Sequence, residues 1–71
     1  MKEKFNYGKA LEKMLEGKAV SCERWPNGIY VQLKKYMEAD IMILTDINRK
    51  TNVQFVPSVE NQIIDNWFVV N

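Results

Sequence analysis

A guanidinium group and two aromatic rings lie close together in the sequence around one short turn. Arg24 and Trp25 precede a Pro-Asn-Gly turn, and Tyr30 follows it. A phosphorylated compound with an aromatic base binds well to a flat ring, a fixed cation and exposed backbone N–H groups, and a turn between two strands can supply all three. We therefore predict a ligand-binding site formed here by Arg24, Trp25, Asn27, Gly28 and Tyr30.

Side chains suited to catalysis or to metal binding are scarce. The chain has no histidine and one cysteine, Cys22. A thiol without a neighbouring base is poorly activated as a nucleophile, and the carboxylates are scattered along a helix and several loops. A zinc site would need carboxylates plus this single thiolate, which is an unusual ligand set. We expect no catalytic residue, no metal site and no cofactor, and we interpret Cys22 as a small buried hydrophobic residue.

The charge balance argues against a nucleic-acid or membrane surface. Ten basic and nine acidic side chains give a net charge of +1. The basic residues Lys34, Lys35, Arg49 and Lys50 fall in two predicted loops and fit a solvated surface better than a nucleic-acid-binding surface. No apolar run approaches the roughly 20 residues of a bilayer span, and the N-terminal sequence lacks a signal-peptide core. We expect a cytoplasmic protein whose partners are neither nucleic acids nor membranes.

The length predicts one small domain over residues 1–71. A chain of this size buries only about 60% of its unfolded surface, so its core needs reinforcement. One cysteine excludes an intramolecular disulfide. The apolar segment Ile41–Leu44 and the terminal strand together exceed what one ten-residue helix can cover. We therefore predict a homo-oligomer.

The first half of the chain predicts a helix followed by two strands. Apolar residues recur with helical spacing at Tyr7, Ala10, Leu11, Met14 and Leu15. Asn6 is placed to cap the start of a helix over residues 7–16, and Gly17 to end it in the left-handed region. From residue 18 the period changes to two, and a second strand follows the turn with Tyr30 and Gln32 on one face.

The second half predicts a hairpin, a short helix and a last strand. Residues 34–39 have no clean period and are interpreted as a connection, whereas Ile41–Thr45 is typical of a strand covered on both faces. Residues 46–50 form the tip of a hairpin that returns over 51–56. Ser58 caps a helix that runs to about Ile64, and Trp67 begins a terminal strand and belongs in the core.

This order indicates the α+β class. An N-terminal helix precedes a small, mostly antiparallel sheet, and a short helix comes before the last strand. The connections are too short for parallel crossovers. Because small α+β domains carry many functions, the binding site has to support any functional conclusion.

Several segments in this order also characterise a known family. They are Phe5-Asn-Tyr-Gly8-Lys-Ala10-Leu11, Leu15-Glu-Gly17-Lys-Ala-Val20, Arg24-Trp25-Pro-Asn-Gly28, Pro57-Ser58 and Asp65-Asn66-Trp67-Phe-Val-Val70. With them the chain resembles, over nearly its whole length, the phage-encoded Thoeris anti-defence proteins of the second type. The resemblance implies a non-enzymatic, oligomeric sponge in the host bacterial cytosol. Such a sponge sequesters a cyclic ADP-ribose-type immune signal, and some relatives also hold cyclic oligonucleotides.

One segment departs from the family pattern. Relatives tend to have Asp-Leu-Leu-Ala-Glu-Asp-Trp near the C-terminus, where this chain has Asn61-Gln-Ile-Ile-Asp-Asn-Trp67. Neutral amides repel phosphate less than acids do, so the change could alter which signal is held. A helix N-terminus also attracts anions, and we therefore add Ser58 and Asn61 to the predicted ligand-binding residues.

Each predicted site residue also has a purely structural interpretation. Trp25 could cover the end of the core, and Tyr30 could be an ordinary exposed strand aromatic. The Asn-Gly pair could serve only the turn, and Ser58 only the helix cap. The alternative function is a protein-interaction adaptor or inhibitor that acts through an oligomeric β-sheet surface.

Overall fold

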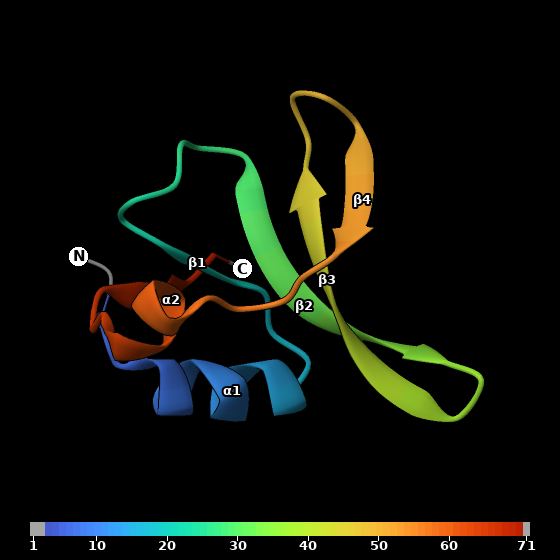
Figure 1. The fold of residues 1–71 in the computed structure, drawn as a ribbon, viewed down its shortest axis with the longest axis horizontal. Coiled ribbons are helices and arrows are strands. Elements are labelled where there is room, and N and C mark those ends of the chain that lie inside the picture. The colour runs from blue at the N-terminus through green and yellow to red at the C-terminus, as the bar shows by residue number, and fades with distance from the viewer. Residues whose placement is uncertain (1–2, 71) are drawn as a thin grey trace.

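The computed structural model describes residues 3–70, whose helices and strands follow the predicted order (Figure 1). They are α1 (Tyr7–Leu15), β1 (Val20–Cys22), β2 (Ile29–Tyr36), β3 (Ala39–Asp46), β4 (Thr51–Gln54), α2 (Val59–Ile63) and β5 (Trp67–Val69). An N-terminal helix, an antiparallel sheet and a short helix before the last strand confirm the α+β prediction.

Helix α1 begins at the predicted residue, Tyr7, and ends at Leu15, one residue before the predicted end. The Asn6 side chain accepts a hydrogen bond from the Lys9 backbone N–H at 2.9 Å, which satisfies one donor of the first turn. Gly17 follows with a φ of +91°, a conformation that suits glycine at a helix C-terminus. The apolar stripe of the helix then packs on β1, β2 and β5.

The sheet is five-stranded within the described residues, with the order β4-β3-β2-β1-β5. One face of β1, β2 and β5 forms the core with α1. The core consists of Tyr7, Ala10, Met14, Val20, Cys22, Val31, Phe55 and Trp67. Trp67 is fully buried, and its indole Nε1 donates a hydrogen bond to the Asn61 carbonyl at 3.0 Å. The predictions that Trp67 and Cys22 are buried are therefore confirmed.

The prediction of a connection over residues 34–39 was wrong. Strand β2 continues to Tyr36 and β3 starts at Ala39, so that only Met37 and Glu38 form the tip of the hairpin. Both tip residues have positive φ, 49° and 70°, as a tight two-residue hairpin turn requires. Glycine or asparagine usually announces such a turn, and neither occurs here.

Strand β3 is also less covered than its apolar run predicts. Helix α1 packs against β1, β2 and β5, whereas β3 and β4 extend beyond it (Figure 1). Residues 41–46 are accordingly half-buried, and all of β4 is exposed. Side chains that alternate with the core residues point to the opposite face of the sheet. This helix-free face carries the pocket described below.

Candidate ligand-binding site

A cavity of about 420 Å³ lies between the helix-free face of the sheet and the turn at residues 25–28. Its floor is formed by three strands, and its wall by that turn together with Ile47. The floor residues are Ala19, Ser21, Tyr30, Gln32, Phe68 and Val70. The cavity is therefore assembled from segments that lie far apart in the sequence.

Strand register explains which side chains form the floor. Val20 pairs with Val31 of β2 and with Val69 of β5, so β1 lies between these two strands. The register places Ser21 between Tyr30 and Phe68 in one row across the sheet. The central strand thus carries a small side chain between two large rings.

A second row parallels the first. Here Ala19 lies between Gln32 and Val70, and the Val70 N–H donates to the Ala19 carbonyl at 3.0 Å. In the first row, the Ser21 hydroxyl donates to the Ile29 carbonyl at 2.8 Å, which directs its hydrogen toward the backbone. Both central side chains are nearly inaccessible, with exposed fractions of 3% for Ala19 and 4% for Ser21.

Two hydrogen bonds join the wall of the cavity to the β3–β4 loop. The Ile47 N–H donates to the Gly28 carbonyl at 2.9 Å, and the Asn48 side-chain amide donates to the Asn27 carbonyl at 3.0 Å. Gly28 has a φ of +96°, and a Cβ on it would lie 2.7 Å from Asn48 Nδ2 and 2.9 Å from Ile47 Cγ1. Glycine is therefore required here both by backbone conformation and by the close approach of the β3–β4 loop.

Trp25 serves the core and the cavity at once. Its ring meets Phe55 and Trp67 edge-on, with centroid distances of 5.6 and 5.2 Å. The same side chain lines the cavity. The two interpretations drawn from the sequence, core cover and ligand contact, are therefore compatible with each other. Packing on two rings also restricts the orientation of the indole.

The cavity lining is neutral. It contains no Asp, Glu, Lys or Arg, and its polar side chains are Ser21, Asn27, Tyr30 and Gln32. Of the cations on neighbouring segments, Arg49 is on the same loop as Ile47 and its side chain is 84% exposed. Such a lining suits the uncharged part of a ligand, with any phosphate directed outward to solvent or to the rim.

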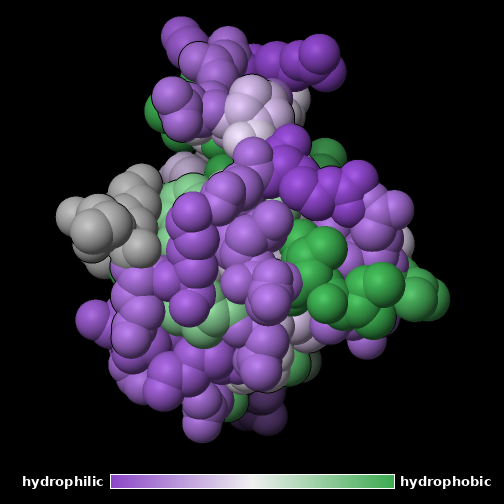
Figure 2. All heavy atoms as spheres, turned by 90° about the vertical axis from the view of Figure 1, so that its left-hand side faces the viewer, coloured by the Kyte–Doolittle hydropathy of each residue, from purple (hydrophilic) through white to green (hydrophobic). Residues whose placement is uncertain are grey.

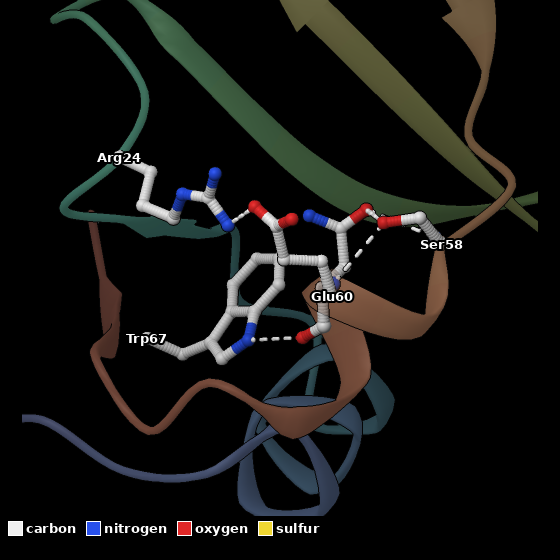
Figure 3. Close-up of polar contacts among 5 residues, drawn as sticks. Arg24, Ser58, Glu60 and Trp67 are labelled. Carbon is white, nitrogen blue, oxygen red and sulfur yellow. Dashed lines mark hydrogen bonds and ion pairs between the residues drawn. The ribbon is translucent and has the colours of Figure 1, made fainter.

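The other three predicted site residues gather at α2 instead. The Arg24 guanidinium forms an ion pair with Glu60, above the Trp67 ring (Figure 3). Ser58 and Asn61 satisfy each other in a capping box, in which the Asn61 N–H donates to Ser58 Oγ at 3.2 Å and the Ser58 N–H donates to Asn61 Oδ1 at 3.0 Å. None of these three side chains lines the cavity.

The structure thus divides the predicted residues into two groups. Trp25, Asn27, Gly28 and Tyr30 line one cavity, whereas the remaining three surround α2. Sequence reasoning missed Phe68, Ser21 and Ala19 as lining residues. The period-two pattern placed Gln32 on the same face as Tyr30, which was a usable signal. The pairing of β1 with β5 had no sequence signal, and so the position of Phe68 in the floor could not be predicted.

The thiol near the site is inert in character. Burial raises the pKa of Cys22. The backbone N–H groups of Arg24 and Trp25 and the positive charge of Arg24 lower this pKa, but their effect is smaller than that of burial. The side chain is completely inaccessible. A protonated, buried thiol is a poor nucleophile. Within residues 3–70, no three or more His, Cys, Asp or Glu residues come close enough to hold a metal ion.

A family model described as the Thoeris anti-defense 2-like domain matches residues 5–70, which is almost the whole chain. Comparison with curated proteins finds no match. Across the described residues, no helix has both the length and the apolar character needed to cross a membrane.

Proposed function

Because the chain belongs to the Thoeris anti-defense 2-like family, we propose that it is a non-enzymatic sponge encoded by a phage. It binds a nucleotide-derived immune signal in the host bacterial cytosol and keeps that signal from its effector. The preferred ligand is a cyclic ADP-ribose isomer, and cyclic oligonucleotides are further candidates. The single observation that carries this proposal is the neutral, aromatic-walled cavity between the sheet and the glycine turn.

The shape and chemistry of the cavity favour the nucleoside part of such a ligand. Its volume of about 420 Å³ lies within the usual range for small-molecule sites, about 300–1,000 Å³. Trp25, Tyr30 and Phe68 offer flat faces for a base. Stacking of a base on an aromatic side chain contributes roughly 1–3 kcal/mol. The absence of lining charges favours a base and a sugar over a bare phosphate.

The phosphate groups of the ligand would then bind outside the cavity. Arg24 precedes Trp25, and the two side chains of its ion pair with Glu60 are each about half exposed. Exposed pairs contribute only about 0–1 kcal/mol, so a phosphate oxygen can replace the carboxylate at little cost. A charge-assisted hydrogen bond from guanidinium to phosphate is the stronger interaction. We therefore keep Arg24 as a proposed ligand contact.

Retention followed by release tests the proposal. The purified protein is incubated with a cyclic ADP-ribose isomer, freed of unbound compound, and heat-denatured, and the supernatant is analysed by mass spectrometry. Intact recovery supports sequestration. Hydrolysis products would instead indicate an enzyme, and no retention would favour the adaptor.

A matched pair of tyrosine variants sharpens this experiment. Tyr30 lines the cavity, whereas Tyr36 lies at the far end of the same strand and is 64% exposed. Tyr30→Ala should reduce retention and Tyr36→Ala should leave it unchanged. Equal retention by both variants would place the ligand elsewhere on the protein.

The adaptor remains the second candidate because large apolar side chains are exposed on α2 and shortly before it. Val56, Val59 and Ile63 are 77%, 73% and 74% exposed, and the last two share one face of α2. Figure 2 shows apolar side chains gathered on one side of a largely polar face of the molecule. Exposed apolar patches often mark protein contacts.

We also propose that the protein assembles into a homo-oligomer. One face of the sheet lacks a helix, and β3 and β4 extend beyond α1 (Figure 1). Residues 41–44 keep part of their apolar surface exposed in the single chain. Sedimentation velocity at micromolar concentration should show an assembly of several copies, and a monomer would refute this proposal.

A further inference from the structure

Gln32 is one of the polar side chains that line the floor of the cavity. Its carboxamide carries two N–H donors and one acceptor oxygen. No side-chain hydrogen bond joins it to another residue of the described range 3–70. The neighbouring Ser21 hydroxyl, by contrast, already donates to a backbone carbonyl. Gln32 therefore keeps its hydrogen-bonding capacity for whatever enters the cavity.

The floor of the cavity offers flat rings on which a ligand can stack. Tyr30 and Phe68 are on strands that flank β1, so their backbones lie two strand spacings apart, about 9.6 Å. The Ser21 side chain between them is only 4% exposed, so the larger side chains around it leave no room for a further ring at its level. A flat ligand therefore stacks on the accessible surface of these rings, at a centroid distance of about 4.5–7 Å.

Gln32 lies beside such a ligand. It follows Tyr30 by two residues on β2, about 6.7 Å along the strand, and is on the same face of the sheet. A base that stacks on the Tyr30 ring therefore has its edge within reach of the Gln32 carboxamide.

We infer that Gln32 selects the base by pairing with an exocyclic amino group and the adjacent ring nitrogen. Its Oε1 accepts a hydrogen bond from the amino group, and its Nε2 donates to the ring nitrogen, which is the bidentate pairing that glutamine forms with adenine. This inference rests on the proposed function, since it identifies how the same cavity recognises the base of its ligand. Gln32 is thus a specificity-determining residue.

A thermodynamic cycle between protein and ligand tests this inference. The probes are a cyclic ADP-ribose isomer whose adenine is linked only through N9, and its purine counterpart without the 6-amino group. Calorimetry measures both affinities for the wild type, for Gln32→Met, which preserves side-chain length, and for Gln54→Leu. Gln54 is an exposed glutamine on β4 outside the cavity and serves as the control.

The expected result is a preference that depends on Gln32. The wild type and Gln54→Leu should bind the adenine probe about 5- to 150-fold more tightly than the purine probe. Gln32→Met should bind the two probes within about twofold of each other. A full preference in Gln32→Met, or no preference in a wild type that binds both probes, overturns the inference alone. Failure of the wild type to bind either probe overturns the proposed function and this inference with it.

Discussion

Replacement of Gly28 by alanine should loosen the wall of the cavity, and Gly17 provides a matched control. Both glycines have positive φ, +96° and +91°. A Cβ at Gly28 would meet Asn48 Nδ2 at 2.7 Å and Ile47 Cγ1 at 2.9 Å, whereas a Cβ at Gly17 would meet nothing within 4 Å. Each variant bears the same conformational strain, and only Gly28→Ala also bears a steric clash.

The magnitudes follow from these contacts. A non-glycine residue in the left-handed region costs about 1–3 kcal/mol, and both variants should lose that much stability. At Gly28 the β3–β4 loop must also shift away, which breaks the 3.0 Å hydrogen bond from Asn48 to Asn27. A hydrogen bond of this kind contributes about 0.5–1.5 kcal/mol. We therefore expect Gly28→Ala to be less stable than Gly17→Ala by about that amount.

Two measurements separate stability from binding. Urea unfolding gives the free energy of unfolding of each variant, and a difference of about 1 kcal/mol corresponds to roughly 4–8 °C in melting temperature for a domain of this size. Retention of a cyclic ADP-ribose isomer is then measured well below the midpoint of unfolding. Gly28→Ala should lose retention and Gly17→Ala should keep it. Equal stability and equal retention in the two variants would refute the role assigned to this turn.

Three further predictions concern single side chains. Arg24→Ala should change the free energy of unfolding by no more than about 1 kcal/mol, because the ion pair with Glu60 is half exposed. The same variant should weaken ligand binding by about 1.5–3 kcal/mol. Unchanged affinity by calorimetry would remove Arg24 from the site. Trp67→Phe should lose about 1–3 kcal/mol in urea unfolding, since the Asn61 carbonyl loses its indole partner, and a neutral result would contradict this. Burial raises the pKa of Cys22 above its ordinary value of 9.0, so the folded state holds the proton more tightly than the unfolded state. Stability should be constant below that value and fall as the pH rises through the folded pKa, and in Cys22→Ala the fall should be smaller; an equal fall in both proteins would argue against it.

Local chemistry made much of the fold predictable. Asn6 and Gly17 bound α1 because one supplies an acceptor and the other a left-handed backbone, and both signals are visible in the sequence. The hairpin at Met37 and Glu38 was not predictable, because its positive φ values fall on residues that do not usually adopt them. Pairing across the sheet creates these constraints, and single-sequence patterns do not show that pairing.

The residues of the candidate site show the same contrast between local sequence signals and pairing across the sheet. The turn residues Trp25, Asn27 and Gly28 were identified because their types announce a turn with an aromatic neighbour. Phe68 was missed because its position opposite Tyr30 depends on β5 joining the sheet beside β1. Arg24 was grouped with the turn by sequence proximity, but the Glu60 carboxylate holds its side chain toward α2.

The alternation along the three floor strands has a consequence for the diversification of such proteins. On β1, for example, Val20 and Cys22 face the hydrophobic core, and Ser21 between them faces the cavity. Along these strands, the positions that build the core therefore alternate with those that shape the cavity. Substitutions that change the cavity can accumulate at one set of positions and leave the core packing unchanged.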